Sequence, residues 1–410
     1  MKEFYNCVII SIIIKERGSR MNYKLMNKNI EVLEFSYDNE THTVTKIVRL
    51  IHPEYAPLGI VEYKTGITRK ALNNWWKDRS IPASRSRFKE VMADIDIESS
   101  VELLERCFGL SLSDPYWIKE IDSHIDWKDI NFFENDFSED MGKLLMGEIY
   151  YSEDLDIFSP DNSSDGNLRK KWKIINGTRY LVKGGNTFNN QEPFNEIVAT
   201  RLYERILDKD DFVPYELIKE DDIYYSACPT MVSCDEELVS AYYIDRVIKQ
   251  RENDSLYTHF LQACHTLNIP HAKLQIDKMI ICDYIIANYD RHYRNFGAIR
   301  DVNTLEWNGI APIFDSGSSL WAIQPTSMIG STYKCKPFKS SVEEQLKLVD
   351  DLSWLDITKL EGFEKEIEAI FEQNPLMDQE RIKAISTQVQ LRINMVIKRK
   401  EELENKRIDL

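Results

Sequence analysis

The spacing of hydrophobic and polar residues divides the chain into three parts. From about Met21 to Phe137 the pattern is mostly helical, and ITRKALNNWWKDRSIPASRSRF predicts a helix that Thr68 begins and that stops before Pro82. Between LMGEIYYSEDLDIFSP and LVSAYYIDRV, short β-like segments surround one helix, and the chain is then helical to its end. The last helix should close a core, because one of its faces carries Ile382, Ile385, Val389, Ile393 and Val396.

This order of elements predicts an α+β protein. We expect a small sheet-bearing lobe followed by a larger helical lobe, with a mostly helical module in front of them. The expected bounds are 1–20 for a mis-assigned start or disordered extension, 21–140 for the N-terminal helical module, 141–235 for the small lobe and 236–410 for the helical lobe.

Composition narrows the class of protein. A chain of 410 residues with 43% hydrophobic content can bury a large core. Its net charge of −16 argues against a general nucleic-acid coat and against a protein that binds anionic membranes, because both need a dominant basic field. The seven cysteines are odd in number and never spaced C-x-x-C, so the sequence predicts neither a disulfide framework nor a zinc site. A reducing, cytoplasmic location fits this pattern best.

The N-terminal residues raise a question about the start of translation. The apolar run CVIISIII is far shorter than the roughly 20 residues that span a bilayer, and no signal-peptide cleavage site follows it. The next residues, KERGSRM, are what a translated ribosome-binding site ahead of Met21 would encode. One hypothesis therefore starts the protein at Met21, and the other keeps Met1 and an ordinary buried N-terminal strand.

A basic cluster follows the Thr68 helix, and it has two interpretations. A helix-turn-helix would use such residues to bind DNA, whereas a short helix pair with a Trp-Trp core is more often a plain packing unit. The cluster comprises Arg79, Arg85, Arg87 and Lys89.

The small lobe carries a candidate phosphate-binding turn in SPDNSSDGNLRKKWKIINGTRYLVKGG. Gly166 allows close backbone approach to an anion, and Arg169, Lys170 and Lys171 supply positive charge. An exposed basic hairpin is the alternative.

The strand TRYLVKGG and the helix EPFNEIVATRLYERI form a second candidate site. Phe194, Ile197, Val198 and Leu202 lie on the packing side of that helix, and Glu196 faces another way. We expect Lys183 and Glu196 to pair, because a lysine that holds nucleotide phosphates in protein kinases is positioned by a helix glutamate.

The segment IIANYDRHYRNFGAIRD places several polar residues at the end of an apolar helix. Asp290 and Asn295 are five positions apart, as in the protein-kinase catalytic loop, and IAPIFDSGSSLW then ends a β-like run in Asp315-Ser316-Gly317. Taken alone, an aspartate such as Asp290 is more often a helix cap or the partner of an arginine. A D-x-G such as that of Asp315 is more often a β-turn. Five features occur here in the order that protein kinases have: a lysine strand, a glutamate helix, a hinge-like strand, D-x-x-x-x-N and D-x-G. This order favours interpreting them together as a kinase site.

From about Met141 to the C-terminus the chain resembles HipA-like bacterial serine/threonine kinases. The residues that carry the resemblance are DGNLRKKW, LVKGG, EPFNEIVA, NYDRHYRNFG and PIFDSGSS. It implies a bilobal protein-kinase-like fold, distantly related to the phosphoinositide-kinase-like fold, that uses ATP and Mg²⁺. By resemblance Asp290 is the catalytic aspartate, Asn295 and Asp315 are magnesium ligands, and Lys183, with Glu196 as partner, binds ATP phosphates.

The resemblance also implies a hinge and a lid. In YYSACPTMV the backbone near Cys228 to Met231 would contact adenine. The glycine-rich lid around Gly166, together with Lys170, would cover the phosphates and carry an autophosphorylated serine, either Ser163 or Ser164.

Partners follow from the resemblance only in outline. HipA toxins phosphorylate an aminoacyl-tRNA synthetase and are neutralised by a small DNA-binding partner, but nothing in this chain identifies either one. We expect a protein substrate with a Ser/Thr acceptor, an antitoxin-like protein partner, DNA bound only indirectly or weakly, and no membrane. The alternatives are a DNA- or antitoxin-binding regulator with a kinase fold, a catalytically idle nucleotide-binding scaffold, and a kinase with a lipid or metabolite acceptor.

Overall fold

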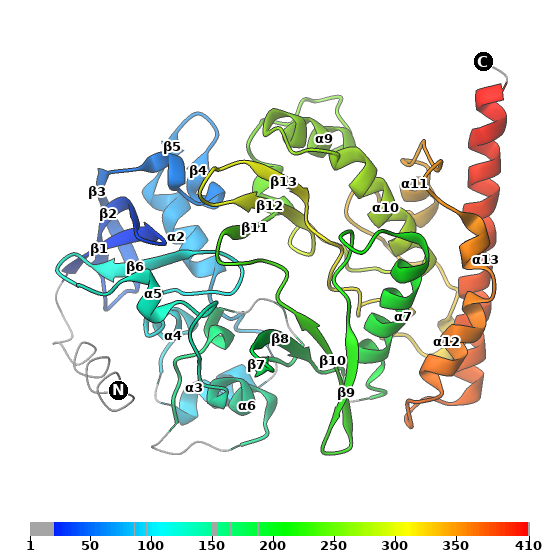
Figure 1. Cartoon of the computed structure of the whole chain (residues 1–410), viewed down its shortest axis with the longest axis horizontal. Helices are drawn as coiled ribbons and strands as arrows, with labels where there is room; N and C mark the ends of the chain where they lie inside the picture. Colours follow the sequence, from blue (N-terminus) through cyan, green and yellow to red (C-terminus); the bar gives the residue numbers. More distant parts are fainter. Residues whose placement is uncertain are drawn as a thin grey trace. The chain divides into compact units, whose positions relative to one another are not determined.

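The computed structural model describes residues 20–408 apart from 86, 96, 150–154, 164, 165, 167 and 187. The described residues form two compact units (Figure 1), the first within residues 20–167, 232–237 and 302–305, and the second within residues 168–231, 238–301 and 306–408. The CVIISIII segment and Met1 lie outside the described part, and the choice between Met1 and Met21 as start stays a prediction. No helix of the described residues is long and apolar enough to cross a bilayer.

The first unit contains an antiparallel sheet of order β3-β2-β1-β6. Its strands are β1 (Arg20–Asn27), β2 (Ile30–Asp38), β3 (Thr43–Leu50) and β6 (Tyr116–Glu120). The prediction of a mostly helical module from residue 21 is therefore wrong. From Leu33 to Asp38 in β2 the buried residues Leu33, Phe35 and Tyr37 alternate with less buried ones, and this period of two is a strand signal that the helical prediction does not fit.

The helix predicted to begin at Thr68 does begin there. Thr68 caps it, accepting a hydrogen bond of 3.1 Å from the Ala71 amide. Trp75 and Trp76 are buried, as expected of a packing core. The remaining elements are β4 (Val61–Glu62), β5 (Gly66–Ile67), α2 (Arg69–Asp78), α3 (Phe88–Asp94), α4 (Ser100–Glu105), α5 (Trp127–Ile130) and α6 (Asp140–Met146).

Arg79, one member of the basic cluster, serves the packing of this unit. Its guanidinium carbon lies 4.7 Å from the centroid of the Trp75 ring, and Nη1 lies 2.6 Å from Oδ2 of Asp114. Both charged side chains are nearly buried, at 8% and 11% exposed. Arg79 thus favours the packing interpretation of the cluster over the DNA-binding one.

The second unit contains the predicted small sheet, of order β7-β8-β10-β9, together with one long helix. The strands are β7 (Lys170–Ile175), β8 (Thr178–Lys183), β9 (Glu216–Glu220) and β10 (Ile223–Pro229), and the helix is α7 (Gln191–Ile206), which contacts β9 and β10. The α+β class is confirmed in this form, as helices combined with several small sheets. The predicted lobe bounds stay predictions.

The rest of the second unit is mainly helical, with two short strands before the Asp315 segment. These are β12 (Gly297–Asp301) and β13 (Trp307–Ile310), which form a sheet with β11 (Glu236–Ser240). The predicted apolar face of the last helix is confirmed, since all five of its residues are buried. The helices are α8 (Ala241–Ile244), α9 (Leu256–Thr266), α10 (Ala272–Ile285), α11 (Val342–Leu346), α12 (Phe363–Phe371) and α13 (Gln379–Ile408).

Candidate active site

Lys183 is the centre of a buried polar cluster in the second unit. It ends β8, pairs with Ser226 of β10 and keeps only 7% of its side chain exposed. Its Nζ donates to Oε1 of Glu196 at 3.2 Å, to Oδ1 of Asp315 at 2.7 Å and to the hydroxyl of Tyr215 at 2.9 Å. The predicted Lys183–Glu196 pair is present, and Asp315 joins it.

The charged side chains of this cluster shift one another's pKa values. Burial would lower the pKa of Lys183, but the charges of Asp315, Tyr215 and Glu196 raise it well above its ordinary value. Burial would raise the pKa of Asp315, yet Lys183 and then Lys170 hold it below its usual range. For Glu196 burial outweighs Lys183 and raises the pKa. At neutral pH the site therefore presents a charged lysine beside an ionised Asp315.

Helix α7 places the side chain of Glu196 in this cluster. The predicted packing residues Phe194, Ile197, Val198 and Leu202 are buried, and Glu196 is buried too, at 2% exposed. Its Oε2 accepts the Ser316 amide at 2.9 Å. Glu196 thus connects the lysine strand with the segment that carries Asp315.

Gly185, between β8 and α7, is closely approached by side chains at the start of α7. Its amide donates to Oδ1 of Asn190 at 3.1 Å, and a Cβ added to Gly185 would stand 2.5 Å from that oxygen. No side chain fits there without moving the loop, so the second glycine of LVKGG has a steric reason.

Asp290 and Asn295 share one turn after α10. Oδ1 of Asn288 accepts the Asp290 amide at 3.0 Å, and Nδ2 of Asn295 donates to the Asp290 carbonyl at 3.0 Å. The Asp290 side chain is 35% exposed, and its Oδ1 accepts Nζ of Lys336 at 2.8 Å. A carboxylate at this place can meet a ligand from solvent.

Arg291 joins the Asp290 turn to the Asp315 segment. Its Nη1 donates to the carbonyl of Asn295 at 2.7 Å and to the carbonyl of Phe314, the residue before Asp315. The side chain is fully buried, and Nε and Nη2 donate to the two oxygens of Asp283 at 2.9 and 3.0 Å. The structure therefore brings the D-x-x-x-x-N and D-x-G motifs together through one guanidinium.

Arg291, Asp283 and Tyr215 belong to the site but were not predicted from the sequence. A usable signal existed for the first two, because Asp283 is a carboxylate within the apolar run of α10 and such a residue needs a cationic partner. Tyr215 had no such signal, since it lies in a connecting segment and meets Lys183 only through the fold.

Asp315 adopts an uncommon backbone conformation, with φ of 57°. Asparagine and aspartate tolerate this left-handed region better than other residues with a side chain, and strained conformations concentrate at functional sites. Gly317 follows, and a Cβ there would lie 3.4 Å from Oε1 of Glu196 and 3.4 Å from the Glu192 carbonyl. The segment is thus closely fitted against α7.

The residues predicted for the hinge occupy the end of β10 and the residues after it. Cys228 pairs with Leu181 of β8 and is 4% exposed, and burial raises its pKa to about 11. Met231 is half-buried. Their contact with adenine stays a prediction.

The residues predicted for the lid fall in both units. In the first unit the carbonyl of Gly166, at φ of 90°, accepts Nε of Arg85 at 3.0 Å, and Oγ of Ser163 donates to the Pro160 carbonyl at 3.2 Å. Ser164 lies outside the described residues. In the second unit Lys170 pairs with Lys183 across β7 and β8, and its charge acts on Asp315. The lid itself stays a prediction.

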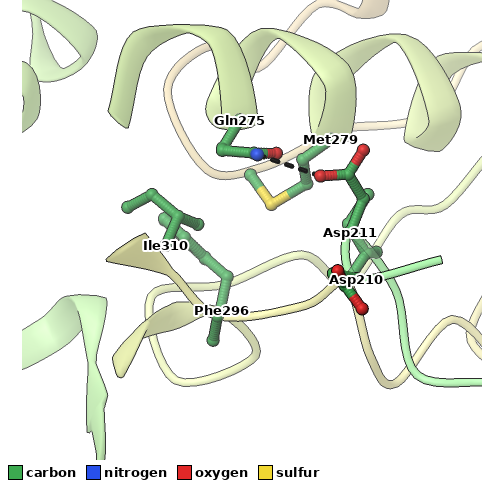
Figure 2. A pocket seen from close by; sticks show the side chains of 8 residues that line it. Asp210, Asp211, Gln275, Met279, Phe296 and Ile310 are labelled. Carbon is green, nitrogen blue, oxygen red and sulfur yellow. Dashed lines mark hydrogen bonds between the residues drawn. The ribbon is translucent and has the colours of Figure 1, made fainter. Parts of the chain in front are cut away.

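A small pocket elsewhere in the second unit does not suit a phosphate. Figure 2 shows Gln275 and Met279 from α10 facing Asp210 and Asp211, with a hydrogen bond of 2.9 Å from Nε2 of Gln275 to Oδ1 of Asp211. Its lining residues are acidic, amide or apolar, and none is one of the predicted site residues.

Magnesium fits the chemistry of Asp315 and Asn295, whose side-chain oxygens are hard ligands. Among the described residues no group of three or more His, Cys, Asp or Glu side chains is placed to hold a metal ion. At nucleotide sites, Mg²⁺ usually takes one or two protein carboxylates together with phosphate oxygens.

Comparisons with known proteins assign no family. No family model and no curated protein matches the chain. Among solved structures, the chain is similar to the crystal structure of a Helicobacter pylori proinflammatory kinase, CtkA, with 21% sequence identity and a TM-score of 0.45 over 57% of this chain and 95% of that chain. A likeness of this size decides neither fold nor activity, so a function must be argued from the contacts of the site.

Replacing Tyr215 with phenylalanine should destabilise the second unit. The variant keeps the ring, whose centroid lies 4.9 Å from Nζ of Lys183, and removes the hydroxyl that accepts from Lys183 and, at 3.3 Å, from the Asp315 amide. We expect the free energy of unfolding to fall by about 1–3 kcal/mol, as for hydrogen bonds to buried charged groups. Urea unfolding measures it.

Tyr63→Phe is the matched control, because Lys64 lies over its ring in the same way but Tyr63 is 51% exposed. Equal stability of the two variants would contradict the expected contribution of the Tyr215 hydroxyl to the free energy of unfolding.

Proposed function

We propose that the chain is an ATP- and Mg²⁺-dependent serine/threonine protein kinase of the HipA type, with a bilobal kinase-like arrangement. The observation that carries the proposal is the buried Lys183 ammonium, which bonds to a helix glutamate and to the aspartate of a D-x-G segment. In a protein-kinase site the phosphate-binding lysine pairs with a helix glutamate, and the D-x-G aspartate holds Mg²⁺.

Each residue has a role that its surroundings support. Lys183, held by Glu196, would bind the phosphates of ATP. Asp315 and Asn295 would hold Mg²⁺, which when bound would neutralise phosphate charge. Asp290 is partly exposed and is linked to the Asp315 segment through Arg291, and it would accept the proton of the attacking hydroxyl.

The hinge, the lid and the partners extend this proposal. The backbone near Cys228 and Met231 would contact adenine, and the lid around Gly166 and Lys170 would cover the phosphates. Autophosphorylation would fall on Ser163 or Ser164. A protein substrate, an antitoxin-like partner and a toxin–antitoxin role rest on the resemblance to HipA kinases alone.

The proposal is tested by the intact mass of the purified protein before and after incubation with ATP and magnesium. The wild type should gain the mass of a phosphoryl group, and Asp290→Ala should not. Peptide mapping then asks whether Ser163 or Ser164 carries the group. Titration with ATP in the presence of magnesium runs beside it, and a wild type that neither binds ATP nor gains mass would refute the kinase assignment.

A further inference from the structure

Lys336 contacts the proposed catalytic aspartate from a distant part of the chain. It lies before α11, and its Nζ lies 2.8 Å from Oδ1 of Asp290. The other carboxylate oxygen, Oδ2, is 3.9 Å from Nε2 of His292, which is too far for a hydrogen bond. One oxygen of Asp290 is thus held by a cation, and the other can accept a proton from a substrate.

The backbone around Lys336 is fixed against the Asp290 turn. Gln345, which is 5% exposed, accepts the Phe338 amide at 3.1 Å and donates to the carbonyl of Lys336. The buried Phe338 ring lies 6.0 Å from the ring of Tyr293, a residue of the Asp290–Asn295 segment. The ammonium therefore approaches Asp290 from an anchored segment.

Stability does not account for this ion pair. The side chains of Lys336 and Asp290 are 49% and 35% exposed, and pairs with such exposure contribute little to folding. Phosphoryl transfer, in contrast, needs positive charge where the transferring group meets the acceptor. Of the two arginines in DRHYRN, Arg291 is fully buried against Asp283, and the guanidinium carbon of Arg294 lies 4.3 Å from the centroid of the Tyr242 ring.

We propose that Lys336 is a catalytic cation that binds the transferring phosphoryl group and orients Asp290. This inference rests on the proposed function. In the step, the acceptor hydroxyl oxygen forms a bond to the γ-phosphorus and gives its proton to Oδ2 of Asp290. The bond from the γ-phosphorus to the β,γ-bridging oxygen breaks, and its electron pair leaves with ADP. Lys336 keeps its protons and contacts Oδ1 of Asp290 and a γ-phosphoryl oxygen throughout.

The test compares Lys336→Ala, Lys336→Arg and the matched control Lys334→Ala, which removes the same charge from an exposed position two residues away. At saturating ATP and magnesium, Lys336→Ala should slow autophosphorylation about 100-fold, with the apparent KM for ATP within about threefold of wild type. Lys336→Arg should recover part of the rate, because it restores a cation. Lys334→Ala should behave as wild type.

A binding measurement separates catalysis from a structural role. ADP with aluminium fluoride and magnesium imitates the transferring phosphoryl group, and Lys336→Ala should bind it about 10-fold more weakly than wild type while its affinity for ADP alone is unchanged. If Lys336→Ala matches Lys334→Ala in rate and in affinity for this analogue, the inference is overturned and the kinase assignment stands. A faster Lys336→Ala also overturns it, because the ion pair would then be inhibitory. A wild type without phosphoryl transfer overturns the proposed function, and this inference with it.

Discussion

Asp315→Asn is expected to lower phosphoryl transfer by about 1000-fold while the protein stays folded. The substitution keeps the shape of the side chain and removes the charge that Lys183 contacts at 2.7 Å. Lys183 retains its hydrogen bond to Glu196, and asparagine tolerates the φ of 57° at this position. The loss should therefore reflect the lost magnesium ligand and not unfolding.

Transfer from labelled ATP measures the effect of Asp315→Asn, and circular dichroism checks the fold. The matched control is Asp222→Asn, because Asp222 also pairs with a lysine, Lys219, but its side chain is 95% exposed. The control should transfer at the wild-type rate. Turnover by Asp315→Asn within a few-fold of wild type would show that Asp315 does not have the assigned role. A second readout is ATP affinity, whose dependence on magnesium should be lost in Asp315→Asn and kept in Asp222→Asn.

Arg291→Leu is expected to cost about 3–5 kcal/mol of the stability of the second unit, because it leaves the carboxylate of Asp283 buried without its cation. Asp283 is 4% exposed, and its remaining side-chain partner is Nδ2 of Asn288 at 2.9 Å. Burial would lower the pKa of Arg291, but Asp283 holds it above its ordinary value, so the guanidinium is charged in the native protein. The variant also removes the connection between the Asp290 turn and the Asp315 segment.

Hydrogen exchange of the α10 amides measures this loss within one unit of the protein. Asp283→Asn in the Arg291→Leu background should recover part of the stability, since the double variant buries no unpaired charge. Arg201→Leu is the control, because Arg201 and its partner Glu204 are 48% and 43% exposed, and it should change stability by no more than about 1 kcal/mol. A loss for Arg291→Leu as small as that of the control would contradict the role of Arg291 in joining the two segments.

Local patterns predicted those features of the protein that depend on neighbours in the sequence. The Thr68 cap needs only the amide three residues later, and the buried face of α13 follows from a repeat of three and four residues. The pairing of Lys183 with Glu196 was also predictable, because a strand and the next helix are close in the chain. The sheet of the first unit was not predicted, although the alternation of buried and less buried residues is visible in β2. The helical pattern around Thr68 does not apply to the strands before it.

The sequence by itself determined which residue types the site contains and in what order they occur. Only the tertiary structure decided how they meet. Tyr215 reaches Lys183 across 32 positions, Lys336 reaches Asp290 across 46, and Asp315 reaches Lys183 across 132. Arg291 joins two motifs through backbone carbonyls, which any residue could supply and no side-chain pattern reveals. Hydrophobic periodicity reports only which face of a segment is buried, and the partners of a buried polar group are decided by the packing of distant segments.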